Sequence, residues 1–201
     1  MADALHARSA LFGLAPPGRH GRESGPAGLV VREVAGSAIA TIAARKGRAE
    51  AVMAALAERY GIRPADAPGR LARDGVAFIG AGPRQWIASA EPPAAAGFVR
   101  DLRARLAGLA AVADQSDSRV VLRLAGEHVR DVLAKGVPID LHPDVFPPGA
   151  TTATLVVHVG VQLSRLDDAE TFELMAPRSM AGSFWSWLTA SAAEFGYEVT
   201  I

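Results

Sequence analysis

The chain has 201 residues, of which 50% are hydrophobic and 21% charged, and its 21 basic and 21 acidic side chains give a formal net charge of +0. This composition supplies ample core and excludes wholesale disorder. Because no excess of positive charge is available for phosphates, we expect no nucleic-acid partner, whereas a neutral chain suits a subunit of something larger. The absence of cysteine excludes disulfides, thiol catalysis and thiolate-bound zinc. No apolar run approaches the roughly 18 residues of a membrane span. No signal-peptide core is visible, so we expect a soluble, cytoplasmic protein without a membrane partner.

Residues 1–27 are expected to form an N-terminal arm. Ala2–Ser9 could make a short helix, but Pro16-Pro17-Gly18 and Gly25-Pro26 break regular structure after it. Such a segment is either disordered alone or ordered by a partner.

Residues 28–114 predict a first α+β unit. Leu29–Val34 and Ala38–Ala44 are strand-like, and the helix that follows Gly47 ends at Gly61. Two strands then form a hairpin around the Gly80–Pro83 turn, and a second helix follows Pro92-Pro93.

Residues 115–201 repeat this order as a second unit. Arg119–Leu124 reads as a half-buried strand, and Glu127–Lys135 as a short helix. The alternation from Leu155 to Leu163 predicts one continuous strand with His158 on its second face, and Thr171–Met175 returns as another strand after an Asp167-Asp168 turn. The predicted fold class is therefore α+β, with two tandem ferredoxin-like βαββαβ units packed together.

The last helix, about Ala181–Phe195, has an unusually wide apolar face. Trp185 and Trp187 fall roughly 80° to either side of the centre defined by Phe184 and Leu188. Either the two tryptophans cover the borders of a wide core face, or one of them anchors a partner chain, because aromatic residues dominate interface hot spots.

No catalytic constellation is visible, so we predict no catalytic, cofactor-binding or metal-binding residues on this chain. The five histidines form no H-x-x-x-H pair, and Gln85 occupies the position where a dinucleotide-binding motif starting at Gly80 would need glycine. Asp167, Asp168 and Glu170 are expected at a solvated hairpin tip, which is a poor environment for acid–base work.

Arg123 and Arg178 are the polar positions of greatest interest. Arg123 lies on the strand face opposite the core residues, and Arg178 precedes the final helix, for which Ser179 could be the cap. Either arginine could pair locally, or could recognise a carboxylate-bearing ligand or a neighbouring subunit. With Trp185 and Trp187 they are the candidate partner-interface residues.

Several segments together resemble the gamma subunit family of heterotetrameric sarcosine oxidase. They are Arg8-Ser9-Ala10-Leu11, Gly82-Pro83 with Trp86, Asp114–Gly126, Val132–Gly136, Asp140–Pro143, Phe146–Gly149 and Ala176–Ser179 followed by Trp185 and Trp187-Leu188. Proline would be more usual at position 10, and cysteine is common where Val137 stands. The resemblance covers nearly the whole chain and is densest from Asp114 to Leu188.

The resemblance implies a fold similar to the folate-binding part of the glycine-cleavage T-protein. It implies a complex that oxidises sarcosine to glycine, makes hydrogen peroxide and passes the one-carbon unit to tetrahydrofolate. FAD, FMN, NAD, zinc and tetrahydrofolate would belong to the alpha, beta and delta subunits, and this chain would be a non-catalytic assembly subunit. Two alternatives stay open: a stand-alone folate-binding protein, or the equivalent subunit of another N-methyl amino-acid oxidase or dehydrogenase.

Overall fold

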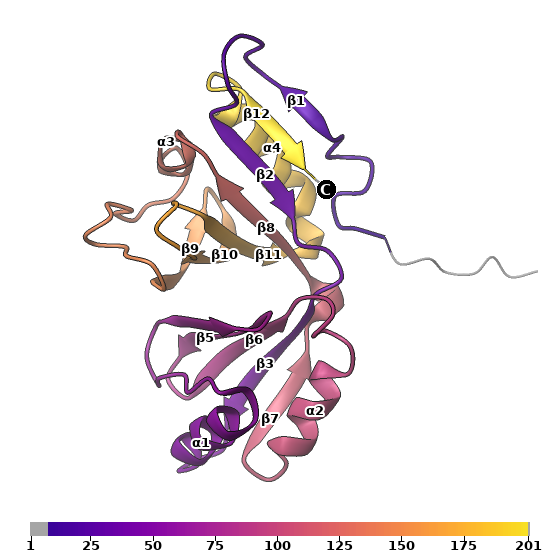
Figure 1. Cartoon of the computed structure of the whole chain (residues 1–201), viewed down its shortest axis with the longest axis vertical. Helices are drawn as coiled ribbons and strands as arrows, with labels where there is room; N and C mark the ends of the chain where they lie inside the picture. The colour runs from indigo at the N-terminus through magenta and orange to yellow at the C-terminus, as the bar shows by residue number, and fades with distance from the viewer. Residues whose placement is uncertain (1–7, 201) are drawn as a thin grey trace, which may run out of the picture.

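The computed structural model describes residues 8–200, whose strands form two sheets (Figure 1). The larger sheet has seven strands in the order β1-β12-β2-β8-β11-β10-β9. Their bounds are Gly18–His20 (β1), Leu29–Glu33 (β2), Arg119–Ala125 (β8), Thr151–Val156 (β9), Val159–Arg165 (β10), Phe172–Pro177 (β11) and Tyr197–Thr200 (β12). Its strands pair antiparallel except β2 and β12, which run parallel.

The smaller sheet has five antiparallel strands in the order β4-β5-β6-β3-β7. Their bounds are Ala38–Ala44 (β3), Arg70–Arg73 (β4), Val76–Gly82 (β5), Gln85–Ala90 (β6) and Ala110–Asp114 (β7). The helices are Ala49–Tyr60 (α1), Phe98–Arg105 (α2), Val129–Ala134 (α3) and Ala181–Ala192 (α4), and two 3-10 turns cover Ser116–Ser118 (η1) and Arg178–Met180 (η2). The α+β class is thus confirmed.

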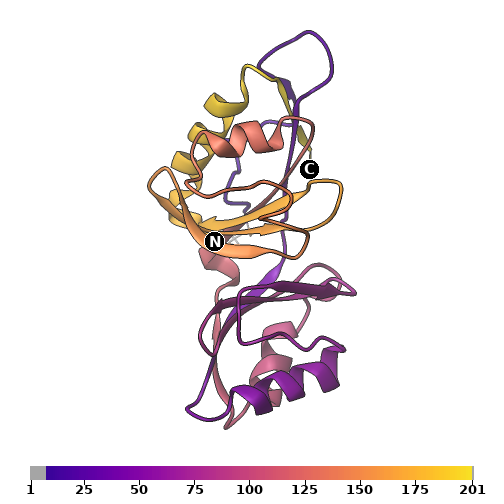
Figure 2. The same ribbon diagram turned by 90° about the vertical axis from the view of Figure 1, so that its left-hand side faces the viewer.

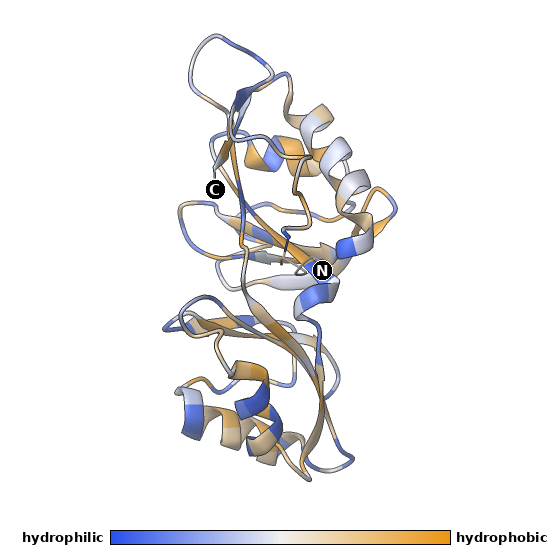
Figure 3. Cartoon of the chain, turned by 90° about the vertical axis from the view of Figure 1, so that its right-hand side faces the viewer, coloured by the Kyte–Doolittle hydropathy of each residue, from blue (hydrophilic) through white to orange (hydrophobic). Residues whose placement is uncertain are grey.

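The two sheets face each other in the middle of the molecule, and the helices lie on the outside (Figure 2). One core fills the space between α1, α2 and the smaller sheet, and a second fills the space between α3, α4 and the larger sheet. A small apolar cluster joins the inner faces of the sheets: Val34, Ile39, Ile79, Ile87, Val121 and Met175. In Figure 3 the helices of the smaller unit carry both hydrophobic and hydrophilic residues.

The two-residue period of a strand decides which side chains of β8 meet the other sheet. Leu122 and Leu124 belong to the helix-side core, whereas Val121 belongs to the cluster between the sheets. Arg123 follows Val121 by two positions and therefore shares its inner face. A charged side chain is in this way placed between the two sheets.

Strand β2 corrects the predicted unit boundary at residue 28. Leu29–Glu33 was assigned to the first unit, but it pairs with β12 and β8 in the larger sheet. Leu29 and Val31 are buried in the core of that sheet. The larger sheet therefore needs a strand from outside residues 115–201, and two self-contained tandem ferredoxin-like units are not confirmed.

The predicted continuous strand from Leu155 to Leu163 was wrong. The chain reverses at Val157-His158, so that Val156 pairs with Val159 and Leu155 with Gly160 in a tight hairpin. Val157 adopts a φ of 56°, which is rare for a β-branched residue. Alternating apolar residues continue through the turn, so the pattern alone hides it, and Leu155 and Val157 are exposed rather than buried.

The arm also differs from the expectation. The predicted helix from Ala2 lies mostly outside the described residues, but residues from Ser9 onward pack on the chain's own larger unit. Leu11 is buried in its core, and β1 pairs with β12. The arm is thus ordered by its own chain, because it covers apolar surface that the sheet would otherwise expose.

Candidate functional site

Arg123 lies at the centre of an ion-pair network between the sheets. Its Nε and Nη2 donate to Glu173 Oε2 at 3.0 and 2.9 Å, and its Nη1 donates to Glu91 Oε2 at 3.2 Å. Arg70 Nε lies 3.5 Å from Glu173 Oε1, and Arg32 lies 3.9 Å from Glu91. Arg70 comes from β4 and Glu91 follows β6, so the network ties the smaller sheet to the larger one.

Two members of the network are largely buried. The side chain of Glu173 is 6% exposed and that of Arg70 10%. Burial alone would lower the pKa of the Arg123 guanidinium, but hydrogen bonds to Glu91 and Glu173 outweigh it and raise that pKa above its ordinary value. Arg123 therefore stays charged and engaged within its own chain, and this network is a clamp between units.

Trp185 and Trp187 have different surroundings on α4. Trp185 is 8% exposed and belongs to the larger core, where it also lines an apolar cavity of about 580 Å³ beside the arm. Trp187 is only partly buried, with its ring centroid 5.7 Å from that of Phe184. Of the two sides of the wide apolar face of α4, the one with Trp185 is thus buried and the one with Trp187 is partly exposed.

Gly136 is required for the position of Trp187. A Cβ added at Gly136 would lie 2.6 Å from ring atoms of Trp187, a distance that real Cβ contacts do not show. We expect Gly136→Ala to destabilise the chain by about 1–3 kcal/mol through overpacking, and to cost almost nothing in a Trp187→Ala background. Urea unfolding of the unchanged chain, the two single variants and the double variant measures this coupling. Gly160→Ala, which would meet nothing within 4 Å, is the matched control. An equal cost in both backgrounds would contradict the contact.

Arg178 holds the arm. Its Nη2 donates to the backbone carbonyl of Arg8, so a residue at the start of η2 is bound to a segment 170 positions away in sequence. The proposed cap at Ser179 is not present, because α4 begins at Ala181 without a side-chain cap hydrogen bond. Of the four candidate interface residues, Arg178 and Trp187 are partly accessible, whereas Trp185 is buried and Arg123 is occupied by carboxylates of its own chain.

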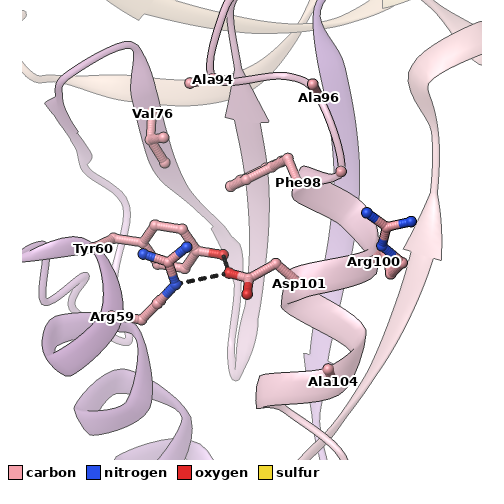
Figure 4. A pocket seen from close by; sticks show the side chains of 10 residues that line it. Arg59, Tyr60, Val76, Ala94, Ala96, Phe98, Arg100, Asp101 and Ala104 are labelled. Atoms are coloured by element: carbon pink, nitrogen blue, oxygen red, sulfur yellow. Dashed lines mark hydrogen bonds and ion pairs between the residues drawn. The ribbon is translucent and has the colours of Figure 1, made fainter.

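A hollow of the smaller unit lies between α1 and α2 and has a volume of about 670 Å³ (Figure 4). The Tyr60 hydroxyl donates to Asp101 Oδ2 at 2.6 Å, and Arg59 Nε donates to the same oxygen at 3.0 Å. Burial and the bond to Asp101 raise the pKa of Tyr60, and the same bond lowers the pKa of Asp101. Tyr60 therefore stays protonated and Asp101 ionised, so the pair links two helices and offers no general base of useful pKa.

The histidines among the described residues have separate surroundings. His158 lies in the β9–β10 turn, His142 in a loop 3.6 Å from Asp144, and His128 is stacked on Phe195 with a centroid distance of 4.4 Å. Within residues 8–200, no group of three His, Asp or Glu side chains could hold a metal ion. In the same residues no helix is both long and apolar enough to cross a bilayer.

Sequence reasoning did not find the partners of Arg123. Glu91 and Glu173 lie 32 and 50 positions away. The available signal was a single charge within an otherwise apolar strand, since Glu173 lies between Phe172 and Leu174 just as Arg123 lies between Leu122 and Leu124. Such a charge needs a buried partner, but only the packing of the sheets identifies it.

The arrangement of the two sheets and their helices is shared with a solved structure of another protein. Aminomethyltransferase T of the glycine cleavage system from Bartonella henselae matches 87% of this chain and 48% of its own with a TM-score of 0.64 at 14% identity, which shows a shared fold. The family model of the sarcosine oxidase gamma subunit matches residues 75–194. A curated sarcosine oxidase subunit gamma from Arthrobacter is 33% identical over 73% of this chain and 71% of its own. The chain belongs to the sarcosine oxidase gamma subunit family.

A solved relative extends this match over nearly the whole length. A chain of the heterotetrameric sarcosine oxidase from Corynebacterium sp. U-96, a complex with pyrrole 2-carboxylate, superposes with a TM-score of 0.79. The match covers 94% of this chain and 96% of that one at 28% identity.

Proposed function

We propose that this chain is the structural, non-catalytic gamma subunit of a heterotetrameric sarcosine oxidase. The observation that carries the proposal is the agreement with a chain of such an oxidase over 94% of one chain and 96% of the other. The reaction of the assembly is the oxidation of sarcosine to glycine, with formation of hydrogen peroxide and transfer of the one-carbon unit to tetrahydrofolate.

In this proposal the chemistry belongs to the alpha, beta and delta subunits, which hold FAD, FMN, NAD, zinc and tetrahydrofolate in the cytoplasm. Support comes from how the ionisable side chains are used. Arg123 and Glu173 clamp the two sheets, and Tyr60 and Asp101 link two helices. None of these four is poised for proton transfer or nucleophilic attack.

The strand orders of the two sheets are related. The strands β5-β6-β3-β7 of the smaller sheet follow the order of a ferredoxin-like unit, and the larger sheet follows the same plan with β2 inserted between β12 and β8. We interpret the molecule as two related α+β units clamped together as one body.

The partner surface includes Trp187 and Arg178 together with the exposed arm residues Phe12 and Leu14, because exposed aromatic side chains mark interfaces. Trp185 and Arg123 support this surface from within.

A co-purification experiment tests the proposal. The tagged chain, expressed in its host, is expected to capture larger subunits whose absorption spectrum contains flavin, and the captured complex is expected to oxidise sarcosine. The untagged chain passed over the same resin is the control. A stable monomer that captures no flavin-bearing protein would reject the proposal.

Two experiments distinguish the alternative functions from the proposed one. A stand-alone folate-binding protein needs free polar groups near Arg123 and Arg178, but Arg123 is saturated by Glu91 and Glu173. Calorimetry of the isolated chain with tetrahydrofolate is therefore expected to show no heat of binding beyond that of acetate at the same carboxylate concentration. Assaying the captured complex against several N-methylated amino acids decides between sarcosine oxidase and a related oxidase or dehydrogenase.

A further inference from the structure

A polar cavity of about 370 Å³ lies where the arm, the β2–β3 connection and the turns η1 and η2 meet. The β2–β3 connection is the segment that crosses from the larger to the smaller sheet (Figure 1). Besides the β2–β3 connection, three segments distant in sequence line the cavity: Arg8-Ser9 from the arm, residues Ser116, Asp117 and Arg119 around η1, and Arg178 from η2. Each of these three segments lies within a stretch on which the family resemblance rests. None of their side chains takes part in the ion-pair network at Arg123.

Three arginines bring positive charge to this cavity. Within residues 8–200, no carboxylate lies within ion-pairing distance of Arg8, Arg119 or Arg178. Arg178 uses one nitrogen to hold the Arg8 carbonyl, which leaves most of its guanidinium fork available. By contrast, Arg123 and Arg130 are each paired with glutamate.

The other polar groups of the lining define the charge of the ligand. Glu33 and Asp117 oppose the three arginines, so the lining carries one net positive charge. Glu33 is already occupied, because it accepts hydrogen bonds from Ser9 Oγ and from the Ala10 amide. The Ser37 hydroxyl oxygen is buried and has no hydrogen-bond partner among the described residues. A buried hydroxyl without a partner is costly and indicates a missing acceptor.

We propose that this cavity binds one carboxylate group. A carboxylate supplies a single negative charge, matches the planar fork of a guanidinium, and accepts a hydrogen bond from Ser37. A phosphate dianion would leave the cavity with excess negative charge. The carboxylate comes either from an acidic side chain of a neighbouring subunit or from a free small molecule. The site itself belongs to this chain and does not depend on the proposed assembly.

Titration of the isolated chain with sodium acetate tests the site, with sodium chloride replaced to keep ionic strength constant. We expect saturable shifts of the backbone amide resonances of Ser37 and Arg178. Arg119→Gln/Arg178→Gln is expected to abolish them, whereas Arg84→Gln, which removes an exposed arginine from the β5–β6 turn, keeps them. Absent shifts in the unchanged chain, or shifts that persist in the double variant, would overturn the proposal.

The double variant also loses the hydrogen bond from Arg178 to the Arg8 carbonyl, so a second variant tests the site with that bond intact. Ser37→Ala removes a hydroxyl that no described residue uses, so it is expected to keep the melting temperature and to weaken acetate binding about tenfold. Unweakened binding by Ser37→Ala, or tighter binding of inorganic phosphate than of acetate, also overturns the proposal.

Chemical modification of arginines, compared between the isolated chain and the assembled complex, identifies the source of the carboxylate. Phenylglyoxal modifies accessible arginines, and mass spectrometry locates the modified residues. If Arg119 and Arg178 react in the isolated chain but are protected in the complex without acetate, the carboxylate belongs to a partner subunit. If they react in both and acetate protects both, it belongs to a free molecule. Reaction at both residues that acetate never reduces rejects the site.

Discussion

Replacing Glu173 with glutamine is expected to lower the free energy of unfolding by about 3–5 kcal/mol. The substitution keeps the shape of the side chain but leaves Arg70, which is 10% exposed, without a carboxylate partner. Arg123 keeps Glu91 but loses the negative charge that accepts its two bonds at Glu173, since the one acceptor oxygen of a glutamine amide is neutral. A buried cation without a counter-charge is expensive because it has exchanged water for a medium of low polarity. Urea unfolding of the isolated chain measures the loss.

Two further variants isolate the effect of burial. Glu50→Gln removes a carboxylate from an ion pair with Arg63 in which both side chains are about half exposed or more, and is expected to cost less than about 1 kcal/mol. Adding Arg70→Met to Glu173→Gln should recover part of the loss, because the stranded cation is removed. If Glu173→Gln and Glu50→Gln unfold at the same urea concentration, the clamp between the sheets does not contribute as we argue.

Replacing Trp185 with alanine is expected to destabilise the isolated chain by about 3–5 kcal/mol. The indole is 8% exposed and borders an apolar cavity with Leu11 and Val31. Deleting it enlarges that cavity and removes a contact surface for the arm, and the loss cannot relax fully because the sheet behind it is rigid. Thermal and urea unfolding of the chain alone measure the change.

Comparison with the neighbouring tryptophan separates a core role from a partner role. Trp187 is partly exposed, so Trp187→Ala should cost less stability than Trp185→Ala and should weaken assembly more than its stability loss explains. Subunit capture at a temperature well below both melting transitions is the readout. A Trp185→Ala chain with unchanged stability but no capture of partners would restore Trp185 as the interface anchor.

Local patterns predicted most of the secondary structure. Glycine and proline punctuation located the β5–β6 hairpin and the end of α1, and the 3.6-residue period located the apolar face of α4. Where the local signal was ambiguous, the prediction failed. Val157 and His158 look like strand residues, yet the chain turns there because the paired strands of the hairpin outweigh the cost of a left-handed valine.

Local patterns did not predict which strands pair with each other. The run Leu29–Val34 correctly predicted a strand, which the structure has at Leu29–Glu33, but a strand of that composition fits either sheet. Its place between β8 and β12 is decided by long-range contacts, and the same contacts fold the arm onto the larger sheet. Arg70–Arg73 was missed as a strand because two arginines in four residues give a weak strand signal, and its pairing with β5 places it at the sheet edge.

The sequence by itself determined the α+β class, the absence of cysteine chemistry, the family, and four residues of interest, because these follow from composition, short-range periodicity and local motifs. Only the tertiary structure decided what those four residues do. Arg123 became a clamp, Trp185 a core residue, Trp187 a border residue and Arg178 the contact for the arm. The physical reason is that burial and electrostatic pairing depend on segments that meet only when two sheets and an arm pack together.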